Sequence, residues 1–215
     1  MSIHLIFDLD ETLVDSRDRI PYLKTVGGRR FAAENINSIS TELYSKFLLD
    51  VVTRYHEKES VSILTNSPEG YAAALLRKHG FPSDLPIYGS AEKPCGEKVK
   101  KVVKNSRVPV EKTLLIGDSA KDILTAHEIY VPSVGTAWGH ESTRYQLERS
   151  EPNVIISDPE ELEDVLIALE RGRITYEGRK DPDNYLYLPE EEYNSPDPDV
   201  QHRSLGDYHP KDFSK

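Results

Sequence analysis

Short, mainly apolar runs alternate with amphipathic stretches along most of the chain. Runs of four or five residues of this kind are typical of strands buried on both faces of a parallel sheet. They predict strands at residues 3–7, 61–65, 86–88, 113–117, 131–135 and 153–157. Between them, apolar residues recur every three or four positions, which is typical of helices packed on a core. This spacing predicts helices at residues 41–57, 68–79, 96–105, 120–129 and 159–172.

The alternation of buried strands and helices predicts an α/β fold, a doubly wound, Rossmann-like parallel sheet with helices on both faces. In such folds, ligands bind beyond the carboxyl ends of the strands. We therefore expect the chemistry just after Phe7, Leu64 and Ile116. Residues 11–39 contain the Gly27-Gly28 pair and many polar residues, so turns and at most short elements are expected there.

Composition and charge restrict the partners of the chain. The 215 residues carry a formal net charge of −10, which disfavours extended binding to nucleic acid. A single cysteine excludes an internal disulfide and fits a reducing compartment. No stretch approaches the roughly 20 apolar residues that a membrane-spanning helix needs, and the N-terminus lacks the apolar core of a signal peptide. We therefore expect a cytoplasmic protein that binds no membrane.

Two acidic side chains follow the first predicted strand. Asp8 and Asp10 are two positions apart, and in an extended segment such residues point the same way. They can therefore share one small site. Because two close carboxylates repel each other, a cation should join them. Magnesium suits this role because it prefers hard oxygen ligands.

Three further segments bring polar groups to the same edge of the predicted sheet. Residues 65–67, Thr-Asn-Ser, follow the second strand, where a hydroxyl and the N–H groups of a helix start suit a phosphate oxygen. Asp118 and Asp122 follow the 113–117 strand and add two carboxylates. Lys93 lies in a loop between strands and offers a positive charge. Each segment alone occurs often by chance, but all of them fall in loops at one edge.

Together, the segments DLDETLVDS, LTNS, the Lys-Pro loop and GDSAKD resemble the four motifs of the haloacid dehalogenase-like hydrolase superfamily, in its phosphatase branch. The resemblance covers roughly residues 3–170. It implies that Asp8 is the nucleophile on phosphorus. It also implies that Asp10 is the general acid that protonates the leaving group and then the base that activates water.

The resemblance assigns the other motif residues as well. Thr65 and Asn66 would hold the phosphoryl oxygens, and Lys93 would pair with the nucleophile and the phosphate. The metal would be Mg²⁺, and its implied ligands are Asp8, the carbonyl of Asp10, Asp118 and, directly or through water, Asp122.

The implied function is a magnesium-dependent phosphatase that hydrolyses a phosphate monoester through an aspartyl-phosphate intermediate. A small metabolite, such as a sugar or nucleotide phosphate, is the expected substrate. The opening DLDETL is also similar to phosphatases that act on phosphoproteins, and Glu11 stands where many members have glycine. A macromolecular substrate, either a phosphoprotein or a nucleic-acid end, is therefore one alternative. A non-catalytic phosphate-binding regulatory module is another.

The spacing of the motifs leaves little room for a cap over the site. Only 54 residues separate Asp10 from Thr65, and the predicted 41–57 helix belongs to the scaffold. We expect a core domain at residues 1–171, into which residues 15–39 insert a much reduced cap or flap. Four arginines of this insertion either bind the leaving group or remain surface charges: Arg17, Arg19, Arg29 and Arg30.

The acidic tail at residues 172–215 differs in composition from the core. It holds five of the 14 prolines and five of the 12 tyrosines. Few apolar residues and many charges indicate disorder, but the tyrosines favour partial docking. Three placements follow from this composition: the tail covers the site, packs on the back of the core, or mediates a protein partner or self-association.

Overall fold

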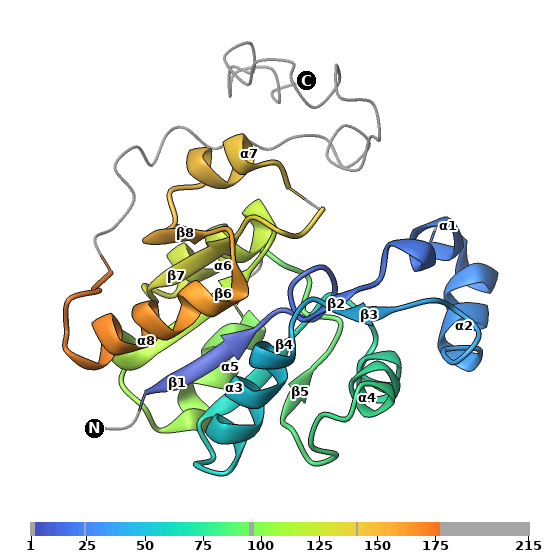
Figure 1. The fold of residues 1–215 in the computed structure, drawn as a ribbon, viewed down its shortest axis with the longest axis horizontal. Coiled ribbons are helices and arrows are strands. Elements are labelled where there is room, and N and C mark those ends of the chain that lie inside the picture. The colour runs from blue at the N-terminus through green and yellow to red at the C-terminus, as the bar shows by residue number, and fades with distance from the viewer. Residues whose placement is uncertain (1–2, 24, 95–96, 141, 177–215) are drawn as a thin grey trace.

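The computed structural model describes residues 3–23, 25–94, 97–140 and 142–176, and a six-stranded parallel sheet forms its centre (Figure 1). The strand order is β5-β4-β1-β6-β7-β8, and each neighbouring pair is parallel. The strands are β1 (His4–Phe7), β4 (Val61–Leu64), β5 (Ile87–Tyr88), β6 (Thr113–Gly117), β7 (Ser133–Thr136) and β8 (Val154–Ile156). The predicted α/β, Rossmann-like sheet is confirmed.

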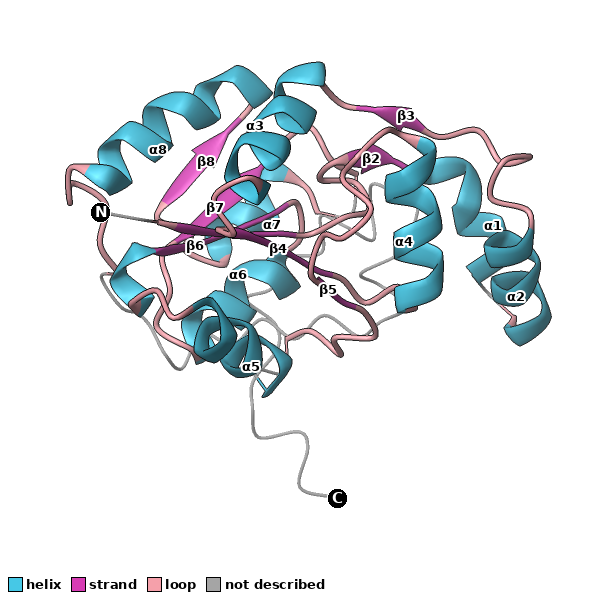
Figure 2. Ribbon diagram, turned by 90° about the horizontal axis from the view of Figure 1, so that it is seen from below, coloured by secondary structure: helices cyan, strands magenta, loops and turns pink. Residues whose placement is uncertain are grey.

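Helices cover both faces of this sheet (Figure 2). On one face lie α3 (Lys46–His56), α4 (Glu69–Lys78) and α8 (Leu162–Glu170), and on the other lie α5 (Glu97–Ser106) and α6 (Ala120–Glu128). Successive strand residues point to opposite faces. Leu5 and Phe7 accordingly pack in the first apolar cluster, and Ile6 packs in the second. Burial of both faces explains why the strands appear as continuous apolar runs in the sequence.

The helix expected at residues 41–57 begins later than predicted, at Lys46. Two of the residues expected in the first turn of this helix form a strand instead. This strand, β3 (Glu42–Leu43), pairs antiparallel with β2 (Val14–Asp15). Ser45 then caps the helix, since its Oγ accepts a hydrogen bond from Phe47 N at 3.1 Å.

Several smaller elements differ from the prediction. The expected 159–172 helix starts with a separate 3₁₀ turn, η3 (Pro159–Glu161). Another 3₁₀ turn, η2 (Val110–Lys112), and the short helix α7 (Arg144–Arg149) were not predicted. A helix of one or two turns leaves too few apolar positions to produce a periodic signal.

Between β2 and β3 the chain leaves the core and forms a small helical cap (Figure 1). The cap contains η1 (Arg17–Arg19), α1 (Ile20–Leu23) and α2 (Val26–Glu34). The Gly27-Gly28 pair, expected in a turn, lies inside α2, where Thr25 Oγ1 accepts from Gly28 N at 2.9 Å and caps the helix. The cap cation Arg30 is exposed and pairs with Glu34, and the side chain of Arg29 lies outside the described residues.

Two further observations concern the rest of the chain. Among the described residues, none of the helices has both the length and the apolar character that crossing a bilayer demands. The tail was expected at residues 172–215. Its first five residues are described, and the Tyr176 hydroxyl lies 3.3 Å from His127 Nδ1. The three placements expected for the tail stay untested for the rest, because residues 177–215 lie outside the described residues.

Burial of His4 in β1 makes stability depend on pH. Its ring Nε2 lies 3.0 Å from Ser62 Oγ, and burial lowers the pKa of His4 from 6.5 to about 4. Between these values the unfolded chain binds the extra proton, so the free energy of unfolding falls as pH decreases, by up to about 1.4 kcal/mol per pH unit. We expect His4→Gln to flatten the decrease between pH 6.5 and 5 in urea unfolding.

Equal slopes for the wild type and His4→Gln would show that His4 does not contribute.

Candidate active site

Three buried carboxylates converge at the carboxyl edge of the sheet. Asp8 follows β1, Asp118 follows β6, and Asp122 lies in the first turn of α6. Because β1 and β6 are neighbours in the sheet, the ends of these segments meet. One carboxylate oxygen from each residue lies within 4.8 Å of the others. The sequence predicts these three residues in one site, and the fold brings them together.

Lys93 reaches into this group from the loop after β5. Its Nζ lies 2.8 Å from Asp8 Oδ1 and also contacts Asp122 Oδ1. Burial alone would lower the pKa of Lys93, but the negative charges of Asp122 and Asp8 outweigh burial and raise that pKa above its ordinary value. The ammonium is thus charged and forms a bridge between two segments of the site.

The charge balance and donor set of this group fit a bound cation. One ammonium does not neutralise three buried carboxylates, and close like charges away from water are unfavourable. A divalent ion would offset the excess negative charge, and carboxylate oxygens are the ligands that hard cations prefer. Asp8, Asp118 and Asp122 are the residues that could hold it.

Neighbouring groups fix the orientation of two of these carboxylates. Asp122 Oδ2 accepts from Ser119 N at 3.1 Å and from Ser119 Oγ at 2.6 Å, which closes a capping box at the start of α6. Asp118 Oδ1 accepts from Thr12 Oγ1 at 3.3 Å, and Asp118 N donates to the same hydroxyl at 3.1 Å. The start of α6 therefore orients the carboxylate of Asp122, and Thr12 of the first motif orients that of Asp118.

Two glycines give these carboxylates the space that they occupy. A Cβ at Gly139 would lie 2.4 Å from Asp118 Cβ, and a Cβ at Gly117 would lie 2.3 Å from Asp122 Cγ. Neither position has room for any side chain unless the carboxylate moves.

Asp10 has a different set of partners, and its carboxylate does not belong to the group of three. Its Oδ1 accepts from Ser16 Oγ at 2.9 Å, and its Oδ2 accepts from Ser67 Oγ at 2.6 Å. Arg19 Nη2 lies 3.1 Å from the same Oδ2. The side chain is thus held by the cap and by the loop after β4. A metal contact through its carbonyl stays a prediction.

The two polar residues after β4 have different surroundings. Thr65 is buried, and its Oγ1 accepts from Ser67 N at 3.0 Å. Asn66 is exposed, and its Oδ1 accepts from Lys93 N at 2.8 Å. Asn66 therefore holds the loop that carries Lys93. Contact of Thr65 and Asn66 with a phosphoryl group stays a prediction.

Glu11 stands where the family resemblance implies glycine, and its backbone conformation is one that favours glycine. Its φ is 62°, in the left-handed region that glycine adopts without strain. Its side chain bonds to the surrounding loop, because Oε1 accepts from Ser16 N at 2.9 Å and Oε2 accepts from the hydroxyl of Tyr44 at 2.8 Å. Trp138 Nε1 donates to the carbonyl of Thr12 at 3.1 Å, so the loop after β7 also braces the first motif.

Sequence reasoning missed four side chains that contact the predicted site residues. Ser67 belongs to the segment 65–67, which is expected to suit a phosphate oxygen, but its contact with Asp10 was not predicted. Thr12 and Ser16 lie within the first motif, and the sequence indicates no role for them. Arg19 was one of four arginines in the cap, and no spacing distinguished it from the others. Only the folded cap shows that Arg19 contacts Asp10 and Ser67.

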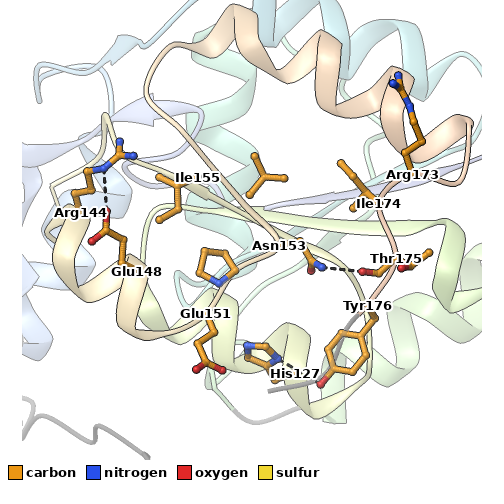
Figure 3. Close-up of a pocket in the computed structure, with 12 residues that line it drawn as sticks. His127, Arg144, Glu148, Glu151, Asn153, Ile155, Arg173, Ile174, Thr175 and Tyr176 are labelled. Carbon is orange, nitrogen blue, oxygen red and sulfur yellow. Dashed lines mark hydrogen bonds and ion pairs between the residues drawn. The ribbon is translucent and has the colours of Figure 1, made fainter. Parts of the chain in front are cut away.

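A hollow of about 610 Å³ lies elsewhere, beside the edge strand β8 (Figure 3). None of the predicted site residues lines it. Several of its polar groups bond to one another: Arg144 to Glu148, Asn153 to Thr175, and His127 to Tyr176. The candidate chemistry therefore lies with the carboxylates at the sheet edge and not in this hollow.

Comparison with solved structures confirms the fold that the motifs imply. A hydrolase from Pseudomonas syringae superposes with a TM-score of 0.64 at 18% identity, covering 77% of this chain and 98% of that one. A haloacid dehalogenase-family hydrolase from Deinococcus radiodurans, solved with bound phosphate and sodium, superposes with a TM-score of 0.62 at 15% identity. That match covers 79% of this chain and 96% of the other. The chain thus has the haloacid dehalogenase-like fold.

Sequence comparison finds phosphatases. A phosphoglycolate phosphatase from Agrobacterium fabrum is 28% identical over 104 residues, which span 46% of this chain and 44% of that protein. One from Pseudomonas fluorescens is 33% identical over 104 residues, 46% of this chain and 38% of that protein. The matched part is less than half the length of either relative. No family model matches the sequence.

The carboxylate group predicts a measurable effect of divalent ions on stability. A ligand that binds only the folded state at 100 times its Kd stabilises that state by about 2.7 kcal/mol. We therefore expect Mg²⁺ to raise the Tm of the wild type and to have little effect on Asp118→Asn, as measured by thermal unfolding with and without Mg²⁺.

Asp164→Asn is the control, because Asp164 is exposed on α8 and its variant should respond to Mg²⁺ as the wild type does. An unchanged Mg²⁺ response in Asp118→Asn would exclude this carboxylate as a ligand.

Proposed function

We propose that the protein is a magnesium-dependent phosphatase that hydrolyses a phosphate monoester through an aspartyl-phosphate on Asp8. The observation that carries this proposal is the placement of Asp8 beside Lys93, Asp118 and Asp122 at the carboxyl end of β1. The similarity to phosphatases in sequence and to hydrolases in fold supports the same reaction class.

In the first half of the reaction, a carboxylate oxygen of Asp8 forms a bond to phosphorus while the ester P–O bond breaks. The departing oxygen takes a proton from Asp10. Attack by a carboxylate on a phosphate brings negative charges together, and the ammonium of Lys93 offsets part of that repulsion. Asp8, Asp118 and Asp122, with the carbonyl of Asp10, would hold Mg²⁺, which would supply further positive charge there.

In the second half, water attacks phosphorus and the bond to Asp8 breaks. Asp10 accepts the proton of that water, so inorganic phosphate leaves and both carboxylates return to their initial state. Division into two steps replaces one difficult displacement with two easier ones. Thr65 and Asn66, at the end of β4, hold the phosphoryl oxygens in this scheme.

The proposed substrate is a small phosphorylated metabolite. Two relatives in sequence are named as phosphatases of such a compound, phosphoglycolate.

The small cap, with only α1 and α2 as its α-helices among the described residues, favours the alternative that the site admits the phosphorylated end of a macromolecule.

The proposal predicts the behaviour of a panel of phosphate esters. The wild type should hydrolyse at least one small ester with Mg²⁺ and lose that activity with excess EDTA. Asp8→Asn should lower kcat by on the order of 10³-fold or more, because the nucleophile is removed. The measurement is steady-state release of inorganic phosphate, with Asp164→Asn as the surface control.

Turnover that survives in Asp8→Asn would exclude the proposed nucleophile. A folded wild type that hydrolyses no small ester but dephosphorylates a phosphopeptide or a nucleic-acid end would replace the small-metabolite proposal with the macromolecular alternative.

A further inference from the structure

Arg19 is a cap residue whose side chain is buried at the active site. It ends the 3₁₀ turn η1, yet it is only 7% exposed. Its guanidinium carbon lies 4.4 Å from the ring centroid of Tyr71, which belongs to α4 of the core. An arginine on this loop would be expected to stay in water, since burial of a charge is costly unless that charge is paired. Its burial therefore requires a partner of opposite charge.

That partner is Asp10, the proposed general acid. Arg19 Nη2 lies 3.1 Å from Asp10 Oδ2, and Arg19 Nη1 donates to Ser67 Oγ at 2.8 Å. Ser67 Oγ in turn donates to the same Asp10 Oδ2 at 2.6 Å. Three side chains from the cap, the first motif and the loop after β4 thus form a closed ring of one ion pair and two hydrogen bonds. The planar guanidinium suits this arrangement because it donates two bonds in fixed directions.

The same cap turn also reaches the other oxygen of Asp10. Ser16, the residue that precedes η1, donates from Oγ to Asp10 Oδ1 at 2.9 Å. Donors at both ends of η1 therefore hold the two oxygens of one carboxylate. The position of this turn and the orientation of the Asp10 carboxylate are therefore linked through these contacts.

We infer that Arg19 is a positioning residue that couples the cap to the general acid Asp10. This inference rests on the proposed phosphatase function. Arg19 acts through Asp10 and Ser67, so its loss affects both steps in which Asp10 transfers a proton. Only the first of them, delivery of a proton to the leaving oxygen, depends on which ester is hydrolysed. Substrate affinity depends on other groups, and it changes little.

Arg17 provides a matched comparison within the same turn. Its side chain is 53% exposed and pairs with Asp15, 2.5 Å away. Arg17 carries the same guanidinium group as Arg19 and lies in the same 3₁₀ turn. Among the described residues, none of its hydrogen bonds or ion pairs reaches Asp10 or Ser67.

The test compares an alkyl phosphate with p-nitrophenyl phosphate. An alkoxide is a poor leaving group and needs a proton from Asp10, whereas p-nitrophenolate leaves without one. The measured quantity is kcat/KM, because it reports only the steps up to formation of the aspartyl-phosphate and excludes the later attack of water. We expect Arg19→Met to lower kcat/KM on the alkyl ester by about 10- to 100-fold, the range for loss of hydrogen bonds to a charged group. On the aryl ester the decrease of kcat/KM should be only a few-fold.

Two more variants separate positioning from folding. Arg19→Lys keeps the charge but loses the fork of donors, so its kcat/KM on the alkyl ester should lie between those of the wild type and Arg19→Met. Ser67→Ala should give the same selective loss on the alkyl ester. Arg17→Met should match the wild type on both esters, and thermal unfolding should show that each variant is folded.

Four results would overturn the inference. Equal losses of kcat/KM on the two esters would show that Arg19 does not act through proton delivery by Asp10, and an increase in KM alone would indicate direct binding of substrate by Arg19. If the wild type with Mg²⁺ hydrolyses no small ester, phosphopeptide or nucleic-acid end phosphate, the proposed function fails and the inference fails with it. Turnover in the wild type, lost in Asp8→Asn but equal in Arg19→Met, would overturn only the inference.

Discussion

The close approach of Asp8, Asp118 and Asp122, with the ammonium of Lys93 between Asp8 and Asp122, is the constraint on which the rest of the site depends. Removal of one partner from a buried ion pair typically costs about 3–5 kcal/mol, so the two buried carboxylates that Lys93 contacts depend on its charge. The parallel order β4-β1-β6 brings the strand ends together. Glycines leave space for the carboxylates, and the capping box of α6 fixes Asp122. Backbone architecture and charge balance therefore support the same arrangement.

A second feature is the separation of two carboxylates that are only two residues apart. Asp8 contacts a lysine from the core, whereas Asp10 contacts hydroxyls and an arginine that come largely from the cap. Two chemically identical groups can take different roles in one reaction when their environments differ. The left-handed backbone at Glu11 lies directly after Asp10, where the chain turns from the sheet toward the cap. In this way the cap contributes directly to the proposed chemistry.

The sequence was sufficient to predict the sheet and the edge where the motifs meet, because continuous apolar runs such as those around Phe7 and Ile116 report burial on both faces. It did not reveal the late start of α3, since the pairing of β3 with β2 is a tertiary choice that the apolar spacing does not encode. It also did not distinguish Arg19, because its partner Ser67 is 48 positions away. Contacts of that kind depend on how the cap folds back onto the core.

The most direct test of the account is chemical trapping of the phosphorylated enzyme. The wild type would be mixed with Mg²⁺ and an accepted ester, quenched in acid, reduced with borohydride and digested for peptide mass spectrometry. An acyl phosphate on Asp8 is reduced to an alcohol, so the account predicts homoserine at position 8 only in samples that received the ester. Turnover with unmodified Asp8, or homoserine at another aspartate, would contradict the assignment of Asp8 as the nucleophile.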